Sequence, residues 1–380
     1  MIKTRRSALF TLVICLLACT PSQCCRSAGG NARSSHNDLT AGRKTEAITK
    51  DPDWEVDTTA RIPQTAQYVV SCTQTAYCWL WDDESLWAYD QQHQLRRISF
   101  ELNENEHIVN GFLLSPEVGW IVSYRGLFQT SDGGQHWTRI NIPQFDSRKG
   151  SIHAVYFIDE KHGWIAGGRY QVPLKGEALP NNALSDDRKR VLVGAVSKTA
   201  DGGSTWQDIE LERSLGRFYE LIFSGSLGLV SGDAGLKVTT DGGAIWRDRL
   251  SAYRQKDTGE LPEVIGSFLL DERRGWVSLS AARIISTGDG GRSWSAFYPS
   301  VALDPAAAPF GWMVFVDKDR GVAVQSSLGG GQLYKTNNAG KTWSPILTGA
   351  RLSGLARVPG SKLVIAVGRE SIFSLTPRQE

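Results

Sequence analysis

From residue 53 onward, short apolar segments rich in Val, Ile, Leu and Trp alternate with polar turns that contain Gly, Asp or Asn. Val118–Thr130, VGWIVSYRGLFQT, and Arg274–Thr287, RGWVSLSAARIIST, each hold two such segments separated by a few residues. Runs of this length, rich in β-branched residues and bounded by turn formers, are typical of antiparallel strands rather than helices. The pattern therefore predicts an all-β fold.

An eight-residue motif, Thr-x-Asp/Asn-x-Gly-x-x-Trp, follows five of these strand pairs, and we call each copy a corner. The polar residue and the Trp of the five corners are Asp132 and Trp137, Asp201 and Trp206, Asp241 and Trp246, Asp289 and Trp294, and Asn338 and Trp343. Successive corners lie 40 to 69 residues apart, with strands for one four-stranded unit between them. Repeats of this length and content predict a β-propeller.

The number of blades follows from the strands outside the five corner-bearing repeats. Four strands without a corner precede them, between residues 67 and 100, and three follow them, between residues 352 and 376. The segment Asp53–Thr58 can supply the missing fourth strand, because pairing it into the last blade closes the ring and removes exposed edges. We predict a seven-bladed β-propeller of four-stranded antiparallel blades closed by the N-terminal strand, with six blades as the alternative.

Each corner is expected to be structural. An Asp or Asn side chain at the third position accepts hydrogen bonds from turn amides, and the following glycine permits a positive φ. The Trp is expected to pack under its own turn and against the neighbouring blade. Because a catalytic group does not need to recur in five blades, catalysis and calcium binding are the less favoured interpretations.

The N-terminus predicts export. Lys3, Arg5 and Arg6 precede an apolar run that is too short to span a bilayer and ends at Leu-Leu-Ala-Cys19. We predict a lipoprotein signal peptide over residues 1–18, a lipidated Cys19 with a disordered tether over 19–50, and a propeller domain over 51–380. The protein is then membrane-anchored and faces the periplasm, the thylakoid lumen or the cell surface.

Charge and composition limit the partners. Losing the three signal-peptide cations would change the net charge from +2 to −1, so no basic field for nucleic acid remains. His and Cys spacing predicts no metal site and no cofactor, and we expect a monomer.

Cys72 and Cys78 flank a short turn, which suits a disulfide in an exported protein; two buried thiols are the alternative.

Function is expected on the face opposite the corners. In a blade, the turns between the second and third strands share one face with the links between blades, and we call it the rim face. The four long connections, Asn141–Gly150, Tyr170–Arg190, Ser251–Glu263 and Tyr298–Pro309, all fall there. Four arginines are predicted on the same face as a partner-binding rim for carboxylates: Arg125, Arg169, Arg283 and Arg369. Ordinary surface charge is the alternative interpretation.

The corners resemble BNR (Asp-box) repeats, and the whole pattern from Asp53 to Thr376 resembles the photosystem II stability and assembly factor family. That resemblance implies a non-enzymatic, lipid-anchored propeller whose partner is a protein or peptide, such as a membrane-complex subunit, bound near an Arg-rich patch. The alternative is a sialidase-like glycoside hydrolase or carbohydrate-binding propeller, because Arg61-Ile-Pro resembles the arginine motif of sialidases.

Overall fold

The apolar segments form the predicted strands, and the strands pair in antiparallel sheets. The computed structural model describes residues 47–48, 51–63, 68–102, 106–123, 126–146, 149–177, 179, 189–254, 261–280, 282–301, 310–325 and 331–379. All of them lie in one compact unit, Thr45–Glu380. The predicted signal peptide (residues 1–18), Cys19 and Arg125 lie outside the described residues.

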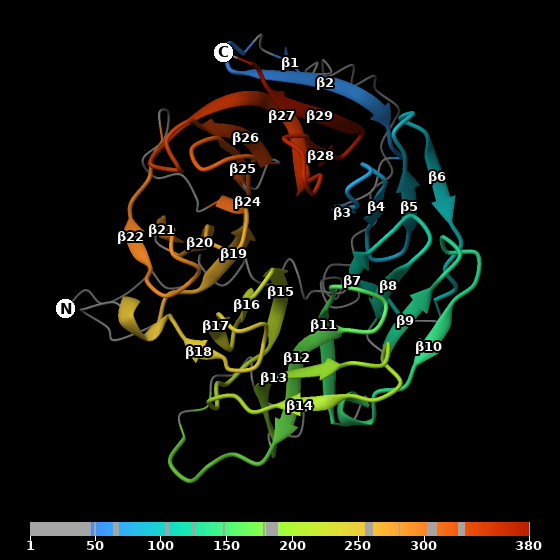
Figure 1. The fold of residues 1–380 in the computed structure, drawn as a ribbon, viewed down its shortest axis with the longest axis vertical. Coiled ribbons are helices and arrows are strands. Elements are labelled where there is room, and N and C mark those ends of the chain that lie inside the picture. Colours follow the sequence, from blue (N-terminus) through green and yellow to red (C-terminus); the bar gives the residue numbers. More distant parts are fainter. Residues whose placement is uncertain are drawn as a thin grey trace, which may run out of the picture. The chain divides into compact units, whose positions relative to one another are not determined.

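The first five blades are separate four-stranded sheets that follow one another around a common centre (Figure 1). Blade 1 contains β3 (Val69–Cys72), β4 (Cys78–Trp81), β5 (Leu86–Tyr89) and β6 (Leu95–Ile98). Blade 2 contains β7 (Ile108–Leu113), β8 (Gly119–Ser123), β9 (Gly126–Thr130) and β10 (Thr138–Ile140). Blade 3 contains β11 (Gly150–Phe157), β12 (Gly163–Gln171), β13 (Val191–Thr199) and β14 (Gln207–Ile209). Blade 4 contains β15 (Phe218–Ser224), β16 (Leu227–Gly232), β17 (Gly235–Thr239) and β18 (Arg247–Asp248). Blade 5 contains β19 (Val264–Leu269), β20 (Gly275–Leu279), β21 (Arg283–Thr287) and β22 (Ser295–Phe297).

Blades 6 and 7 share one long strand, β27 (Thr342–Arg357). Its first part pairs with β26 as the outer strand of blade 6, and its last part pairs with β28 as the inner strand of blade 7. The other strands of these two blades are β24 (Phe310–Phe315), β25 (Gly321–Gln325), β26 (Gly331–Thr336), β28 (Val364–Gly368), β29 (Ser371–Pro377) and β2 (Trp54–Arg61). Short elements complete the described secondary structure: β1 (Ala47–Ile48), β23 (Ser300–Val301), and the 3-10 helices η2 (Pro143–Phe145) and η4 (Ser251–Tyr253).

The predicted closure is confirmed. β2 pairs antiparallel with β29 from Trp54 opposite Pro377 to Arg61 opposite Ser371. The innermost strands contact one another in the order β3, β7, β11, β15, β19, β24 and β27, and β27 contacts β3 again. The described strands therefore make seven blades in a closed ring, as predicted, and β2 covers the edge that β29 would otherwise expose.

The ordered structure reaches further toward the N-terminus than residue 51. Within the range predicted as a tether, Ala47 pairs with Thr348 and Ile48 pairs with Leu347 of β27. Farther along, the Lys335 ammonium contacts the Asp51 carboxylate at 2.7 Å and the Asp53 carboxylate at 2.6 Å. These contacts fasten the chain to blade 6 immediately before β2 begins.

A disulfide joins the ends of the turn between β3 and β4. Cys72 and Cys78 face each other in the strand register with a Cα–Cα distance of 4.0 Å, and their sulfur atoms are bonded. This geometry favours the disulfide over the two free thiols that the sequence left as an alternative.

Neighbouring blades are joined by aromatic side chains in a recurring trio. The Trp of a second strand stacks on a Phe that ends the innermost strand of the next blade, as Trp120 does on Phe157 at 3.8 Å between centroids. The corner Trp of that next blade, Trp206, packs edge-on against the same ring at 6.3 Å. In such a trio the corner Trp reaches the neighbouring blade through an intervening Phe, whereas Trp137 of blade 2 contacts Trp79 of blade 1 directly at 5.7 Å. The other trios are Trp164, Phe223 and Trp246, and Trp276, Phe315 and Trp343.

The corners have the expected geometry and one additional feature. In the fourth corner, Asp289 accepts hydrogen bonds from the Ser293 amide at 2.9 Å and its hydroxyl at 2.6 Å. The Thr that begins the corner is equally important, because Thr287 Oγ1 donates to Asp289 and accepts the Gly291 amide at 2.9 Å. Gly134 shows why the second glycine is needed: its φ is 87°, and a Cβ there would lie 2.4 Å from the Ile98 side chain of blade 1.

We expect the corners to make stability sensitive to acid. Hydrogen bonds from the Ser293 hydroxyl and then from its amide lower the pKa of Asp289 to about 2, from 3.8. Because the folded-state pKa is depressed, the stabilisation is present above pH 3.8 and is lost as pH falls through about 2. Asp289→Asn should therefore reduce the fall in melting temperature across this range, since an amide does not titrate.

The fifth corner provides the matched control. Asn338 already accepts the Thr342 amide through its side-chain oxygen at 2.9 Å, so an amide suits this position. Asn338→Asp should steepen the acid dependence of the melting temperature while Asp289→Asn flattens it. Equal acid profiles for the wild type and both variants would contradict a role of these carboxylates in holding the corners.

Candidate functional site

The rim face carries a cavity at the junction of blades 2 and 3. Its volume is about 550 Å³, and it is lined by Pro143, Gln144, Lys149, Arg169, Tyr170 and Gln171. The link between the two blades, which contains η2, forms one wall, and the end of β12 forms the other. We call this cavity the rim pocket. It combines two cations, two amides and an aromatic ring, which are groups that bind carboxylates and peptide backbones.

Arg169 is the predicted rim residue that lies in this pocket. It sits near the end of β12, opposite Gly150, and a Cβ on Gly150 would lie 3.0 Å from the Arg169 Cα. The Arg169 guanidinium lies 5.2 Å from the centre of the Phe145 ring, and its Nη1 donates to Asp208 at 2.6 Å. Since Asp208 engages only one terminal nitrogen in this bond, the pair is monodentate, and the planar fork of Arg169 retains donors.

Lys149 supplies the second cation of the rim pocket, and sequence reasoning did not select it. Its side chain is 59% exposed, and its Nζ donates to the Pro143 carbonyl at 2.9 Å and lies 3.4 Å from Asp146. The Tyr170 amide donates to the Lys149 carbonyl at 2.8 Å, which ties the link to the end of β12. The only sequence signal for Lys149 was its place in a long connection of the rim face.

The other predicted rim arginines lie on different blades. Arg283 begins β21 in blade 5, where it donates to the Tyr253 carbonyl at 3.1 Å and the Tyr298 hydroxyl at 2.8 Å. Arg369 lies in the turn between β28 and β29, and its Nε is buried without a hydrogen-bond partner. Neither lines the rim pocket.

A polar cluster on the innermost strands was also missed by sequence reasoning. His153 and Tyr219 occupy bulges near the starts of β11 and β15, and their rings meet edge to face at 5.2 Å. The Tyr219 hydroxyl donates to Asp233 at 2.7 Å. Burial, followed by the nearby charge of Arg217, lowers the pKa of His153 to about 3, so this imidazole is neutral near pH 7.

Glu220 follows Tyr219 and extends the cluster to blade 5. It accepts hydrogen bonds from the Ser267 hydroxyl at 2.7 Å and the Ser231 hydroxyl at 2.9 Å, and burial raises its pKa. These bonds link blades 4 and 5 near their rim ends. Alternation of polar and apolar residues does not reveal such a cluster, because each bulge shifts the register by one residue.

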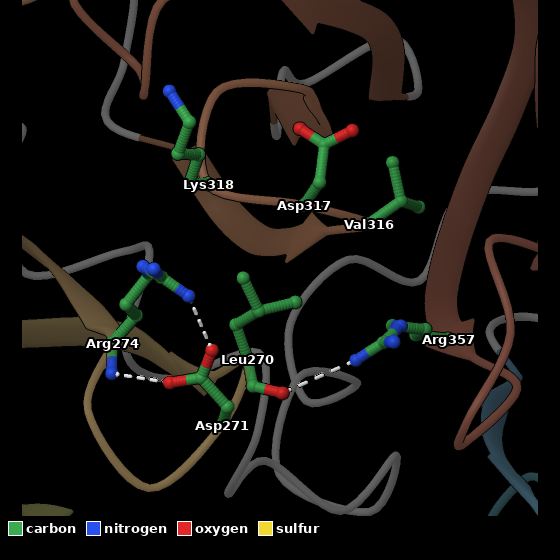
Figure 2. A pocket seen from close by; sticks show the side chains of 7 residues that line it. All are labelled: Leu270, Asp271, Arg274, Val316, Asp317, Lys318 and Arg357. Atoms are coloured by element: carbon green, nitrogen blue, oxygen red, sulfur yellow. Dashed lines mark hydrogen bonds and ion pairs between the residues drawn. The ribbon is translucent and has the colours of Figure 1, made fainter.

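The corner face has a smaller pocket of about 350 Å³, lined by Leu270, Asp271, Arg274, Val316, Asp317, Lys318 and Arg357 (Figure 2). Its charged side chains have partners within or next to the pocket, as those of the rim pocket do. Arg274 Nη1 donates to Asp271 at 2.7 Å, and Arg357 Nη1 donates to the Leu270 carbonyl at 3.2 Å. Asp317 is engaged by Arg320 Nε at 2.8 Å. This pocket also contains cations, so substitutions there can serve as a control, on the opposite face, for charge substitutions in the rim pocket.

Arg61, which suggested a sialidase, ends β2 and donates to the Ser371 hydroxyl at 3.0 Å. Among the residues that the structure describes, no group of three or more His, Cys, Asp or Glu side chains is arranged to hold a metal ion. Within the same residues, no helix has the length and apolar character needed to cross a membrane.

The fold and its strand order define the class of this protein: a seven-bladed β-propeller closed by its N-terminal strand. The chain resembles the photosystem II assembly factors. It is 28% identical over 271 residues to the photosystem II assembly lipoprotein Ycf48 of Synechococcus sp. strain CC9902, covering 69% of this chain and 65% of that relative. It is 27% identical over 273 residues to the protein of the same name from Nostoc sp. strain PCC 7120, covering 56% of this chain and 79% of the relative. No family model matches.

Solved structures agree on the fold. YCF48 bound to a D1 peptide superposes with a TM-score of 0.60 at 17% identity, covering 88% of this chain and all of that one. YCF48 from Cyanidioschyzon merolae gives 0.59 at 15% identity, covering 85% and 99%. An ancestral GH74 enzyme gives 0.57 at 13% identity over 84% of this chain and 45% of that one. At these identities the likeness concerns the propeller fold alone.

Proposed function

We propose that this chain is a non-enzymatic assembly factor that binds a peptide segment of a membrane-complex subunit in the rim pocket. The observation that carries the proposal is the placement of Arg169 and Lys149 in one cavity with Tyr170 and two amide side chains. The similarity to photosystem II assembly lipoproteins, and a solved neighbour that holds a D1 peptide, indicate which kind of peptide to test first.

The chemistry of the rim pocket suits an acidic peptide. A guanidinium fork and an ammonium both form charge-assisted hydrogen bonds to a carboxylate. Gln144 Nε2 donates to the Trp206 carbonyl at 3.0 Å, which fixes its side chain, while its Oε1 has no hydrogen-bond partner. Because this oxygen is buried, the two cations are the groups that would hold a carboxylate of the peptide.

Charge substitutions on the two faces test this proposal. The rim variant, Lys149→Glu with Arg169→Gln, and the control variant, Lys318→Glu with Arg274→Gln, change the net charge equally on opposite faces. For a synthetic D1 peptide, measured by calorimetry, we expect the rim variant to bind about tenfold more weakly or worse, since it loses charge-assisted hydrogen bonds. The control should bind like the wild type. Equal affinities for both variants, or no binding to the wild type, would overturn the proposal.

We also infer that Cys19 carries lipid and anchors the propeller to a membrane as an exported protein. The charged and apolar N-terminal residues that end at Cys19 support this, as does the word lipoprotein in the names of both curated relatives. A lipid anchor would keep the rim pocket near newly inserted membrane subunits. Metabolic labelling with a fatty acid should mark the wild type and not Cys19→Ser.

A further inference from the structure

The long connection between β12 and β13 exposes apolar side chains that no function above uses. Val172 is 76% exposed and Leu174 is 59% exposed, and Val172 is the most exposed large hydrophobic residue in the described part of the chain. Pro173 stands between them. A soluble protein gains free energy by burying such side chains, so a pair held in solvent indicates a surface that is covered in use.

This loop is held in place at its base. Arg213, in the link that follows β14, donates from Nε to Glu177 Oε1 at 2.8 Å and from Nη2 to Glu177 Oε2 at 2.9 Å. It also bonds to the Gln171 side chain and to the Val172 carbonyl. The Leu174 amide donates to Glu177 at 3.0 Å. These contacts fix both ends of the segment 171–177, and the Val172 and Leu174 side chains between them are exposed.

The exposed charged residue next to this pair is a cation. Lys175 is exposed directly beside Leu174, and Lys189 and Arg190 close the described part of the loop. The Arg190 guanidinium lies over the Tyr170 ring at 4.7 Å. Glu177 is the one carboxylate in the described part of this loop, and it faces Arg213, with only 15% of its side chain exposed.

Exposed aliphatic residues beside an exposed Lys match the interface of an anionic bilayer, where apolar side chains enter the acyl boundary and cations meet headgroup phosphates. We propose that Val172 and Leu174 form a membrane-contacting tip that inserts into an anionic lipid surface, with Lys175 at the level of the headgroups. Because Arg213 already holds the loop in one conformation, insertion into the membrane costs less conformational entropy.

Photo-crosslinking in the full-length protein tests the tip and identifies what covers it. Leu174→p-benzoylphenylalanine places a probe at the tip. Ile245→p-benzoylphenylalanine is the matched control, because Ile245 is 54% exposed and lies in a corner on the opposite face. After illumination of intact cells, adducts are identified by mass. We expect about tenfold more phospholipid adduct at position 174 than at 245, since the proposed tip places the probe in the apolar phase only at position 174.

Two outcomes would overturn the proposal of a membrane-contacting tip. One is equal lipid adduct at both positions, and the other is a protein adduct that dominates at position 174, which would assign the loop to a protein partner. Adding Lys175→Glu should lower the lipid adduct at position 174 if headgroup phosphates hold the tip. D1-peptide binding, measured separately in the rim pocket, reports on the proposed function whatever the result at the tip.

Discussion

Trp343→Ala is expected to lower the free energy of unfolding by about 4 kcal/mol, since deletion of a buried indole leaves a large cavity. Trp343 is 1% exposed, and its ring centre lies 4.7 Å from that of Phe310 and 6.1 Å from that of Phe315. Phe315 in turn stacks on Trp276 of blade 5 at 3.7 Å. The substitution therefore loosens the junction between blades 5 and 6, and urea denaturation measures the loss.

Trp294→Ala serves as the control for this prediction. Trp294 occupies the same corner position, but it is only partly buried, and the innermost strand of its blade ends in Leu269 instead of Phe. Its replacement should cost about half as much, because fewer contacts are lost. Similar losses for the two variants, or a loss below about 1 kcal/mol for Trp343→Ala, would show that the aromatic trios do not hold the blades together.

Val56→Asp should destabilise the protein nearly as much as Trp343→Ala, with an expected loss of about 3 kcal/mol in the free energy of unfolding. Val56 lies in β2 opposite Leu375, and both belong to the buried cluster shared by blades 6 and 7. A carboxylate at this position would be buried without a partner, so it would displace the strand that closes the ring. Urea denaturation gives the loss, and amide exchange shows whether blade 7 opens.

The neighbouring residue provides the matched control. Glu55 lies on the same strand with its side chain exposed, so Glu55→Gln should change the unfolding free energy by less than about 0.5 kcal/mol. If Val56→Asp were as stable as Glu55→Gln, β2 would not be required for closure, and blade 7 would be stable with three strands.

The fold was predictable from the sequence because its determinants are local and repeated. Each corner encodes its own turn through Thr, Asp and Gly, and the strands before it alternate within a few residues, so period and strand number follow directly. The closing strand was predictable for a physical reason, since three strands at the C-terminus leave an edge that another strand must cover. The Phe at the centre of each aromatic trio was missed, because a Phe at the end of an apolar strand looks like any other core residue.

The candidate site was less predictable. The face was inferred from loop length, and Arg169 lies in the rim pocket on that face. That Lys149 lines the same pocket depends on how a link between blades folds back on β12. The bulges that place His153 and Tyr219 side by side leave no trace in the alternation of residues. Likewise, the clamp of Glu177 by Arg213 joins residues from two separate loops and has no sequence motif.

We propose that the corners are scaffold and that recognition takes place on the rim face. Amide exchange of the full-length protein, measured with and without the D1 peptide, compares the two faces in one experiment. We expect slower exchange at residues 143–149 and 169–171, while the corners at 130–137, 199–206 and 239–246 exchange at unchanged rates. Slower exchange confined to the corners, with the rim pocket unaffected, would contradict the claim.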